Sequence, residues 1–589
     1  MKLEFNEMDP GNKKKLADDF LDRFWKWRLN NAPEFATYIG FHDFDDKLSD
    51  MDMSSYICRQ QDLKVFLEEV SFILRSISDD IDKETLFNLQ LLQDDLENLI
   101  YNFKFKPHLM PLNQLEGPQI NFPELISYMK TSNIEDFEKI IRRFQLFPKQ
   151  IEQIKGLMEE GIRLGILMHS VSVQPVPEQI KSLLDSPLEQ CSLFKPFLNK
   201  PISMQDPVWS EIVTKAKHTL TSSVFPAYKL LSAFLKETYL PVTRKHIAVS
   251  SLPDGKELYE RCLNFHTTTT LSPEEVHRLG KEEVERIRDR MEFVKNSVDF
   301  KGDLDEFKST LRNDPTFRYT SASEIVEHYN EVCENISKVL PKLFSKFPKN
   351  PYVIKPVPDE SAPNAPGAYY VGASQDGSRP GTFFINTYQA KEQCRFGSVC
   401  LSLHEADPGH HFQDSLQSES ESLPSFRRFH EDMKYYEAPA RFAMNTAYGE
   451  GWGLYCEYLG EELQLYDDPY EMFGRLGDEM LRACRLVVDT GMHAFSWTRE
   501  EATEYMFTNL SCSRHEVETE IDRYITWPGQ ACGYKIGEIK IRELRRLAEK
   551  ELGSSFDLKE FHNMVLLLGD VPLHVLEKMT REFIRTSKV

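Results

Sequence analysis

Residues 402–413, with the sequence SLHEADPGHHFQ, combine residue types that suit a catalytic zinc site. His404 is followed directly by Glu405, and His410 and His411 come shortly after. Neutral imidazole nitrogens bind zinc, and a carboxylate beside the first histidine can take a proton from the water that the metal activates. The stretch therefore predicts zinc chemistry, with Glu405 as the general base.

The spacing differs from the common helical zinc motif, His-Glu-x-x-His, whose histidines lie four residues apart on one helix face. His404 and His410 are six residues apart, which is roughly 240° around a regular helix. His411 would return to the face of His404, but about 10.5 Å further along the helix axis. Two imidazoles at that separation cannot share a zinc at about 2.1 Å, so a regular helix is excluded.

Pro408 and Gly409 offer a way to distort such a helix. Proline removes a backbone hydrogen bond and clashes with the preceding turn, and glycine tolerates unusual dihedrals. A bulge at these two residues would return His410 to the His404 face. We expect His404 and His410 to be ligands, with His411 as a supporting group or as the ligand if no bulge forms. The alternative is a chance cluster at a kinked helix end.

A zinc held by two histidines needs a third protein ligand and an open position. Glu450 and Glu457 are seven residues apart, hence on one helix face, in an otherwise apolar and aromatic segment. Buried carboxylates are costly unless they are paired or bind a metal, and Gly453 between them permits close packing. We assign Glu450 as the third ligand and Glu457 as its partner in an outer shell. The alternative is that both are surface groups of an amphipathic helix.

Composition limits the classes of protein to consider. The chain has 589 residues, 41% of them hydrophobic, and a formal net charge of −22, which argues against nucleic-acid binding. The first residues contain no apolar segment of an export signal, and no apolar run reaches the length of a transmembrane helix. The ten cysteines are scattered and read as reduced thiols. We expect a cytoplasmic protein with no nucleic-acid or membrane partner and an unknown oligomeric state.

Helical periodicity dominates the chain. Apolar residues recur every three or four positions in the first 110 residues, and Ser272 to Glu275 predicts a capped helix start. Further capping boxes are predicted at Thr498–Glu501, Ser513–Glu516 and Asp557–Glu560. The proline-rich residues 175–207 are predicted to be irregular.

Residues 347–381 contain many prolines, which excludes long helices, and residues 382–387 have the composition of a strand. An exposed edge strand there could pair with a substrate backbone. The alternative is a strand of a small structural sheet. We expect a mainly α protein with a mainly helical part (1–345) and a zinc-site part (346–589), forming one catalytic unit.

The motifs together resemble the family called domain of unknown function 885. The similarity lies in residues 404–413 and 450–457, and in the further segments 32–43, 376–386, 489–493, 497–502, 524–538, 556–562 and 569–573. The resemblance implies a large helical zinc-hydrolase fold related to the gluzincin peptidases, with two lobes around a cleft and a small sheet near residues 350–390. It implies His404, His410 and Glu450 as zinc ligands and Glu405 as the base.

The expected function is therefore zinc-dependent peptide hydrolysis. The oxyanion of the reaction needs a hydrogen-bond donor, for which Tyr534 is the first candidate and His493 the second. Arg379 could pair with a substrate carboxylate. Two alternatives remain: a zinc hydrolase of a non-peptide amide or ester, and a non-catalytic helical binding protein. An intact Glu405 argues against the second alternative, because structural zinc needs no neighbouring base.

Overall fold

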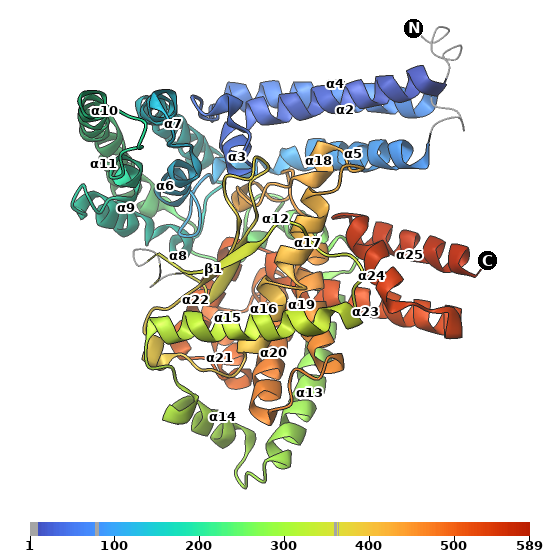
Figure 1. Cartoon of the computed structure of the whole chain (residues 1–589). Helices are drawn as coiled ribbons and strands as arrows, with labels where there is room; N and C mark the ends of the chain where they lie inside the picture. The colour runs from blue at the N-terminus through green and yellow to red at the C-terminus, as the bar shows by residue number, and fades with distance from the viewer. Residues whose placement is uncertain (1–9, 77–81, 359–361, 363–364, 589) are drawn as a thin grey trace. The chain divides into compact units, whose positions relative to one another are not determined.

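The computed structural model describes residues 10–76, 82–358, 362 and 365–588. Residues 1–9, on which the expectation of no export signal rests, lie outside this range. The chain is mainly helical with one small sheet, as predicted (Figure 1). All ten cysteines are free thiols.

The chain divides into two compact units, each built from separate segments. Unit 1 comprises Met1–His246, Ser251–Leu258 and Pro424–Ala443. Unit 2 comprises Ile247–Ser250, Tyr259–Leu423 and Met444–Val589. The boundary predicted after residue 345 falls inside unit 2 and stays a prediction.

Unit 1 is helical, and its first core forms where the sequence predicts apolar stripes. Helices α2, α4 and α5 lie side by side and bury, among others, Phe20, Phe24, Leu63 and Val70 (Figure 1). The prediction that residues 175–207 are irregular is partly wrong, because Val176 and Pro177 begin a helix, where a proline needs no amide partner. The helices are α2 (Pro10–Asn31), α3 (Pro33–Tyr38), α4 (Met53–Ser76), α5 (Lys83–Asn102), α6 (Pro118–Tyr128), α7 (Ile134–Leu164), α8 (Ser170–Val173), α9 (Val176–Asp185), α10 (Asp206–Thr219), α11 (Phe225–Phe234) and α18 (Ser425–Arg428).

Unit 2 is built around two pairs of long helices: α13 packs along α20, and α19 packs along α23. Helix α12 (Gly255–Thr267) has residues in both units. The other helices of unit 2 are α13 (Pro273–Ser297), α14 (Leu304–Asn313), α15 (Ala322–Val339), α16 (Ser398–Glu405), α17 (His410–Ser418), α19 (Thr446–Glu462), α20 (Pro469–Ala494), α21 (Arg499–Asn509), α22 (Arg514–Thr526), α23 (Gly533–Leu552), α24 (Leu558–Leu567) and α25 (Leu573–Ser587).

The helix starts follow the capping signals with one exception. Ser272, Thr498 and Ser513 each form the predicted capping box. Asp557 caps α24 through the amide of Lys559, so the box predicted there does not form.

The sheet has three strands in the order β1-β3-β2, namely β1 (Tyr352–Pro356), β3 (Gly381–Ile385) and β2 (Ala368–Val371). Strand β3 pairs in parallel with β1 and antiparallel with β2. The prediction of an edge strand at residues 382–387 is therefore wrong: β3 is central, and both of its sides are already paired. Phe383 and Ile385 pack in one core with Ala406, so the sheet supports the segment between His404 and His410.

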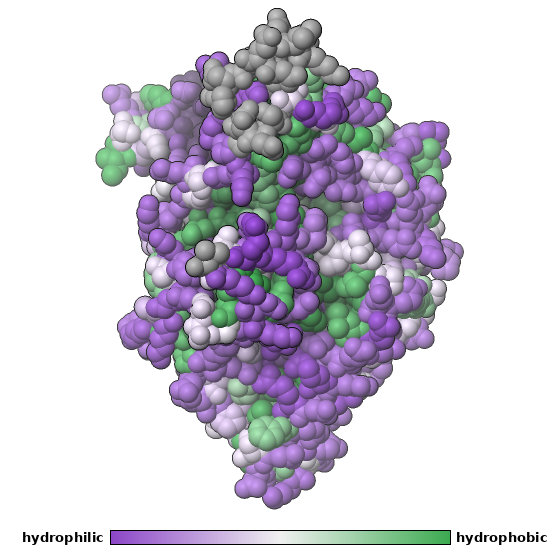
Figure 2. Space-filling model, turned by 90° about the vertical axis from the view of Figure 1, so that its right-hand side faces the viewer, coloured by the Kyte–Doolittle hydropathy of each residue, from purple (hydrophilic) through white to green (hydrophobic). Residues whose placement is uncertain are grey.

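Hydrophilic residues cover most of the face shown in Figure 2, as the acidic composition leads one to expect. Among the described residues, no helix combines the length and the apolar character needed to cross a membrane.

The first turn of α13 offers a test of the capping interpretation. The Ser272 hydroxyl accepts a hydrogen bond from the Glu275 amide at 3.2 Å, and the Glu275 carboxylate accepts one from the Ser272 amide at 2.8 Å. We expect Ser272→Ala to cost about 1 kcal/mol locally and to speed amide exchange at residues 274–276 about fivefold in hydrogen-exchange mass spectrometry. Ser297→Ala, at the other end of the helix, should leave these amides unchanged. Equal exchange in both variants would contradict the interpretation.

Candidate metal site

The chain between His404 and His410 breaks one helix into two. Helix α16 ends at Glu405, and α17 begins at His410. The predicted bulge within a single helix is therefore wrong, although the distortion lies where Pro408 and Gly409 predict it. A Cβ atom on Gly409 would lie 1.9 Å from the His404 carbonyl oxygen, so a side chain at this position would prevent the turn. The turn brings the rings of His404 and His410 to a centroid distance of 4.7 Å, nearly perpendicular to each other at 89°.

The three predicted ligands form a compact cluster. One Glu450 carboxylate oxygen lies 3.3 Å from His404 Nε2 and 3.4 Å from His410 Nε2. The ligand atoms of His404, His410 and Glu450 all lie within 4.8 Å of one another. Two imidazoles and one carboxylate are the donor set of a catalytic zinc site of the His₂Glu type. The residues present therefore fit a zinc ion.

Glu457 orients His404 from behind. The Glu457 carboxylate accepts a hydrogen bond from His404 Nδ1 at 2.8 Å and lies 3.8 Å from Arg482. With a metal cation in the cluster, a proton kept on Nδ1 would leave Nε2, the atom that faces Glu450, as the nitrogen with a lone pair. Carboxylate–histidine pairs of this kind are common behind zinc ligands because they fix the tautomer and the ring orientation.

Helix α19 holds His404 and the turn through direct contact. A Cβ on Gly453 would lie 2.7 Å from Cε1 of the His404 ring, so the imidazole packs on bare helix backbone. Trp452 Nε1 donates a hydrogen bond to the Pro408 carbonyl at 2.8 Å, and Cys456 Sγ contacts the same oxygen at 3.3 Å. The residues around Gly453 thus fix the ring and the turn that carries His410.

The cluster carries an excess of negative charge. Burial lowers the pKa of His404, but hydrogen bonds to Glu450 and Glu457 outweigh it and raise the pKa to about 10. Burial raises the pKa of Glu450, but the two histidines hold it well below its usual range. Carboxylates that stay ionised in a buried site favour a cation beside them. The electrostatics therefore agree with the donor set.

Glu405 is the last residue of α16 and is 8% exposed. It lies close enough for its charge to act on His404. Within the described part of the chain, its carboxylate forms no hydrogen bond or ion pair. It is therefore not held in the inner network as Glu457 is.

Tyr534, at the start of α23, is 7% exposed, and its hydroxyl accepts hydrogen bonds from Arg523 at 3.0 Å and Gln530 at 3.5 Å. Burial raises the pKa of Tyr534, and the negative charge of Glu450 adds to this effect. The phenol is therefore protonated at neutral pH and within electrostatic range of the cluster. Because its oxygen already accepts two bonds, its O–H is directed to an acceptor elsewhere.

Two other predicted residues have structural roles. His493 is fully buried; its Nδ1 accepts from the Val249 amide at 3.0 Å, and its Nε2 donates to the Tyr524 carbonyl at 3.0 Å. Both of its ring nitrogens are engaged by backbone, so the assignment to the oxyanion is wrong. His411 has one nitrogen 2.6 Å from Asp407 and the other 3.1 Å from the Asn350 carbonyl. It connects α17 to Asn350, just before β1, and is not a ligand.

Arg379 lies in the loop between β2 and β3, where its backbone is bonded to Ser374. Its proposed contact with a substrate carboxylate stays a prediction. Other residues that support the site were not predicted from the sequence, among them Trp452, Arg482 and Arg523. Trp452 lay within the motif that pointed to Glu450, whereas the two arginines carry no signal in the sequence.

Residues 33–579 match the model of a family described as a bacterial protein of unknown function (DUF885). The chain belongs to this family. A comparison of the chain with curated proteins found no match.

Two solved structures resemble this DUF885 protein over nearly their whole length. The first is a putative lipoprotein from Colwellia psychrerythraea, with 28% identity, a TM-score of 0.90, and coverage of 98% of this chain and 100% of the other. The second is a putative lipoprotein of unknown function from Shewanella oneidensis, with 17% identity, a TM-score of 0.65, and coverage of 96% and 99%. The likeness to the second shows a shared fold alone. The expected cytoplasmic location stays a prediction.

The contact between Gly453 and His404 gives a direct test of the site. We expect Gly453→Ala to displace the imidazole and weaken zinc binding by about tenfold or more, since changes beside a metal ligand typically cost 10–100-fold in affinity. Competition titration with a chromophoric chelator measures this. Gly477→Ala in α20, where a Cβ meets no atom within 4 Å, is the matched control. Unchanged affinity in Gly453→Ala would remove His404 from the ligand set.

Proposed function

We propose that this DUF885 protein is a zinc-dependent hydrolase of the gluzincin type that cleaves peptides. The observation that carries the proposal is the convergence of His404, His410 and Glu450, with the carboxylate of Glu405 beside them. A zinc ion there would act as a Lewis acid, polarising a carbonyl and lowering the pKa of a water towards about 7. A structural zinc site is closed by four protein ligands, whereas this cluster offers three, which favours catalysis.

The chain's own residues supply the other parts of the reaction. Glu405 acts as the general base that takes a proton from the attacking water and later delivers it to the leaving amine. Tyr534 donates a hydrogen bond from its hydroxyl to the developing oxyanion, and Arg523 and Gln530 hold the phenol for that purpose. Glu457 keeps His404 in the tautomer that presents Nε2 to the cluster.

An amide or ester that is not a peptide would use the same residues. A peptide library and a set of simple esters therefore belong in the same assay. Turnover confined to the esters would support the assignment as a hydrolase and contradict the assignment as a peptidase. A helical binding protein without catalysis would turn over neither.

The role of the base is tested with Glu405→Gln. We expect it to keep about one zinc per chain by plasma emission analysis and to lose peptide turnover by about 100-fold or more, since a general base contributes 10²–10⁴-fold. Glu392→Gln, an exposed carboxylate in the same part of the chain, should retain full activity. Loss of the zinc in Glu405→Gln would instead make Glu405 a ligand. Removal of the metal by a chelator should abolish turnover in the wild type, and added zinc should restore it.

The role of Tyr534 is separable from that of the base. We expect Tyr534→Phe to lower kcat about 10- to 100-fold with little change in KM, because the hydrogen bond forms mainly in the transition state. Tyr388→Phe changes an exposed tyrosine and should have no effect. Steady-state kinetics decide: an increase in KM with unchanged kcat would make Tyr534 a residue that only binds the ground state.

A further inference from the structure

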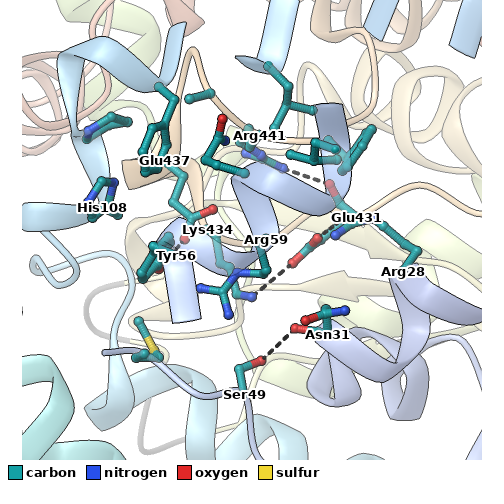
Figure 3. Close-up of a pocket in the computed structure, with 18 of the residues that line it drawn as sticks. Arg28, Asn31, Ser49, Tyr56, Arg59, His108, Glu431, Lys434, Glu437 and Arg441 are labelled. Carbon is teal, nitrogen blue, oxygen red and sulfur yellow. Dashed lines mark hydrogen bonds and ion pairs between the residues drawn. The ribbon is translucent and has the colours of Figure 1, made fainter. Parts of the chain in front are cut away.

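Unit 1 contains a partly open cavity of about 80 Å³ that has no part in the metal site. One face of α4 forms one side of it through Tyr56, Arg59, Gln60 and Leu63, which recur at helical spacing. Helix α2 and the segment between residues 431 and 442 form other sides. Figure 3 shows Arg28, Lys434 and Arg441 directed toward Glu431.

Positive charge exceeds negative charge among the residues that line this cavity. They include four cationic side chains, Arg28, Arg59, Lys434 and Arg441, but only the two carboxylates Glu431 and Glu437. The surplus stands out in a chain whose formal net charge is −22. Burial lowers the pKa of His108, a further lining residue, to about 3, so its ring is neutral at physiological pH.

The carboxylates near the cavity compensate the charge of only some of these cations. Glu431 is 5% exposed and forms an ion pair with Arg28, and Lys434 lies 3.8 Å from its second oxygen. Glu437 accepts a hydrogen bond from Tyr56 at 2.7 Å. Glu34, behind the cavity, also acts electrostatically on Lys434. Arg28 and Lys434 are therefore compensated.

Arg59 and Arg441 are less well compensated. Within the described residues, neither forms an ion pair with a carboxylate, although Glu431 acts electrostatically on Arg441. Arg441 is 6% exposed; it donates one bond to the Glu431 carbonyl at 2.7 Å, and its Nε and Nη1 have no hydrogen-bond partner. Arg59 donates to the Asp50 carbonyl at 2.9 Å and lies over the Tyr56 ring. A buried guanidinium with unused donors is costly unless an acceptor reaches it.

Aromatic rings form the other part of the cavity wall. The His108 ring is stacked between Tyr56 and Phe103, at centroid distances of 4.4 and 4.9 Å. Trp27 and Leu99 also line the cavity. A single water needs about 10–15 Å³ of volume measured in this way, so the cavity has room for a carboxylate or phosphate group. The remainder of a ligand would extend along the apolar wall to the open side.

We propose that this cavity is a binding site for a small molecule that joins an oxyanion, a carboxylate or a phosphate, to an apolar body. Arg441 and Arg59 bind the oxyanion, and the wall that includes Phe103 and Trp27 contacts the apolar body. The site is separate from the zinc chemistry and does not depend on it.

The test is isothermal titration calorimetry of the full-length protein with 3-phenylpropionate. A carboxylate would also bind a zinc ion, so the protein is first dialysed against the neutral chelator 1,10-phenanthroline and then against Tris buffer. We expect one binding event, weakened about tenfold or more in Arg59→Gln and in Arg441→Gln, because each loses a charge-assisted hydrogen bond. Arg163→Gln, an exposed arginine of α7 in the same unit, should bind as the wild type does.

Two further ligands separate the parts of the proposal. Phenethylamine has the same apolar body with the opposite charge and should not bind. Inorganic phosphate should bind more weakly than 3-phenylpropionate; equal binding would overturn the apolar half of the assignment. No binding of either anion, or equal binding to the Arg59→Gln variant, would overturn the site. Circular dichroism checks folding, and if buried Arg441 cannot be replaced, the half-buried Arg59 decides the result.

Discussion

The close approach of α19 to His404 is the constraint on which the candidate metal site depends. Within three turns, this helix provides the proposed ligand Glu450, the bare backbone at Gly453 against which the imidazole lies, and the orienting carboxylate of Glu457. The same helix packs along α23, whose first turn carries Tyr534. A shift of α19 by even one side-chain layer would therefore disturb ligand, orientation and oxyanion donor together. Packing that transmits small displacements in this way is typical of dense protein interiors.

The sequence predicted the members of this site better than it predicted their arrangement. Residue chemistry alone selected His404, His410 and Glu450. Histidines and carboxylates in an apolar segment are costly to bury unless they are paired or bind a metal. The helical spacing also showed that a regular helix could not bring the two histidines together. It could not distinguish a bulge from a complete break, since both relieve the same steric conflict at Pro408.

The errors have a common physical origin, which is that a local pattern does not reveal tertiary partners. The strand at residues 381–385 has the composition of any strand, and only its pairing with β1 and β2 makes it central. His493 follows an aspartate and a glycine in the sequence, which made it a candidate for the site. Backbone groups from distant segments form hydrogen bonds with both of its ring nitrogens. No local sequence pattern predicts the cavity of unit 1, because Arg59 and Arg441 are separated by hundreds of residues.

Unbalanced charge in a buried setting identifies both sites, with opposite signs. Around His404, three carboxylates from α16 and α19 face a pair of imidazoles, and Arg482 lies beside only one of these carboxylates, Glu457. Among the residues that line the cavity of unit 1, cationic side chains outnumber carboxylates, and the buried guanidinium of Arg441 retains unused donors. Folding alone gives no reason to keep either imbalance, since replacing unpaired buried charges with apolar residues is often neutral or stabilising. A bound species of the opposite charge would remove each imbalance, namely the proposed metal cation in the first case and the proposed oxyanion in the second.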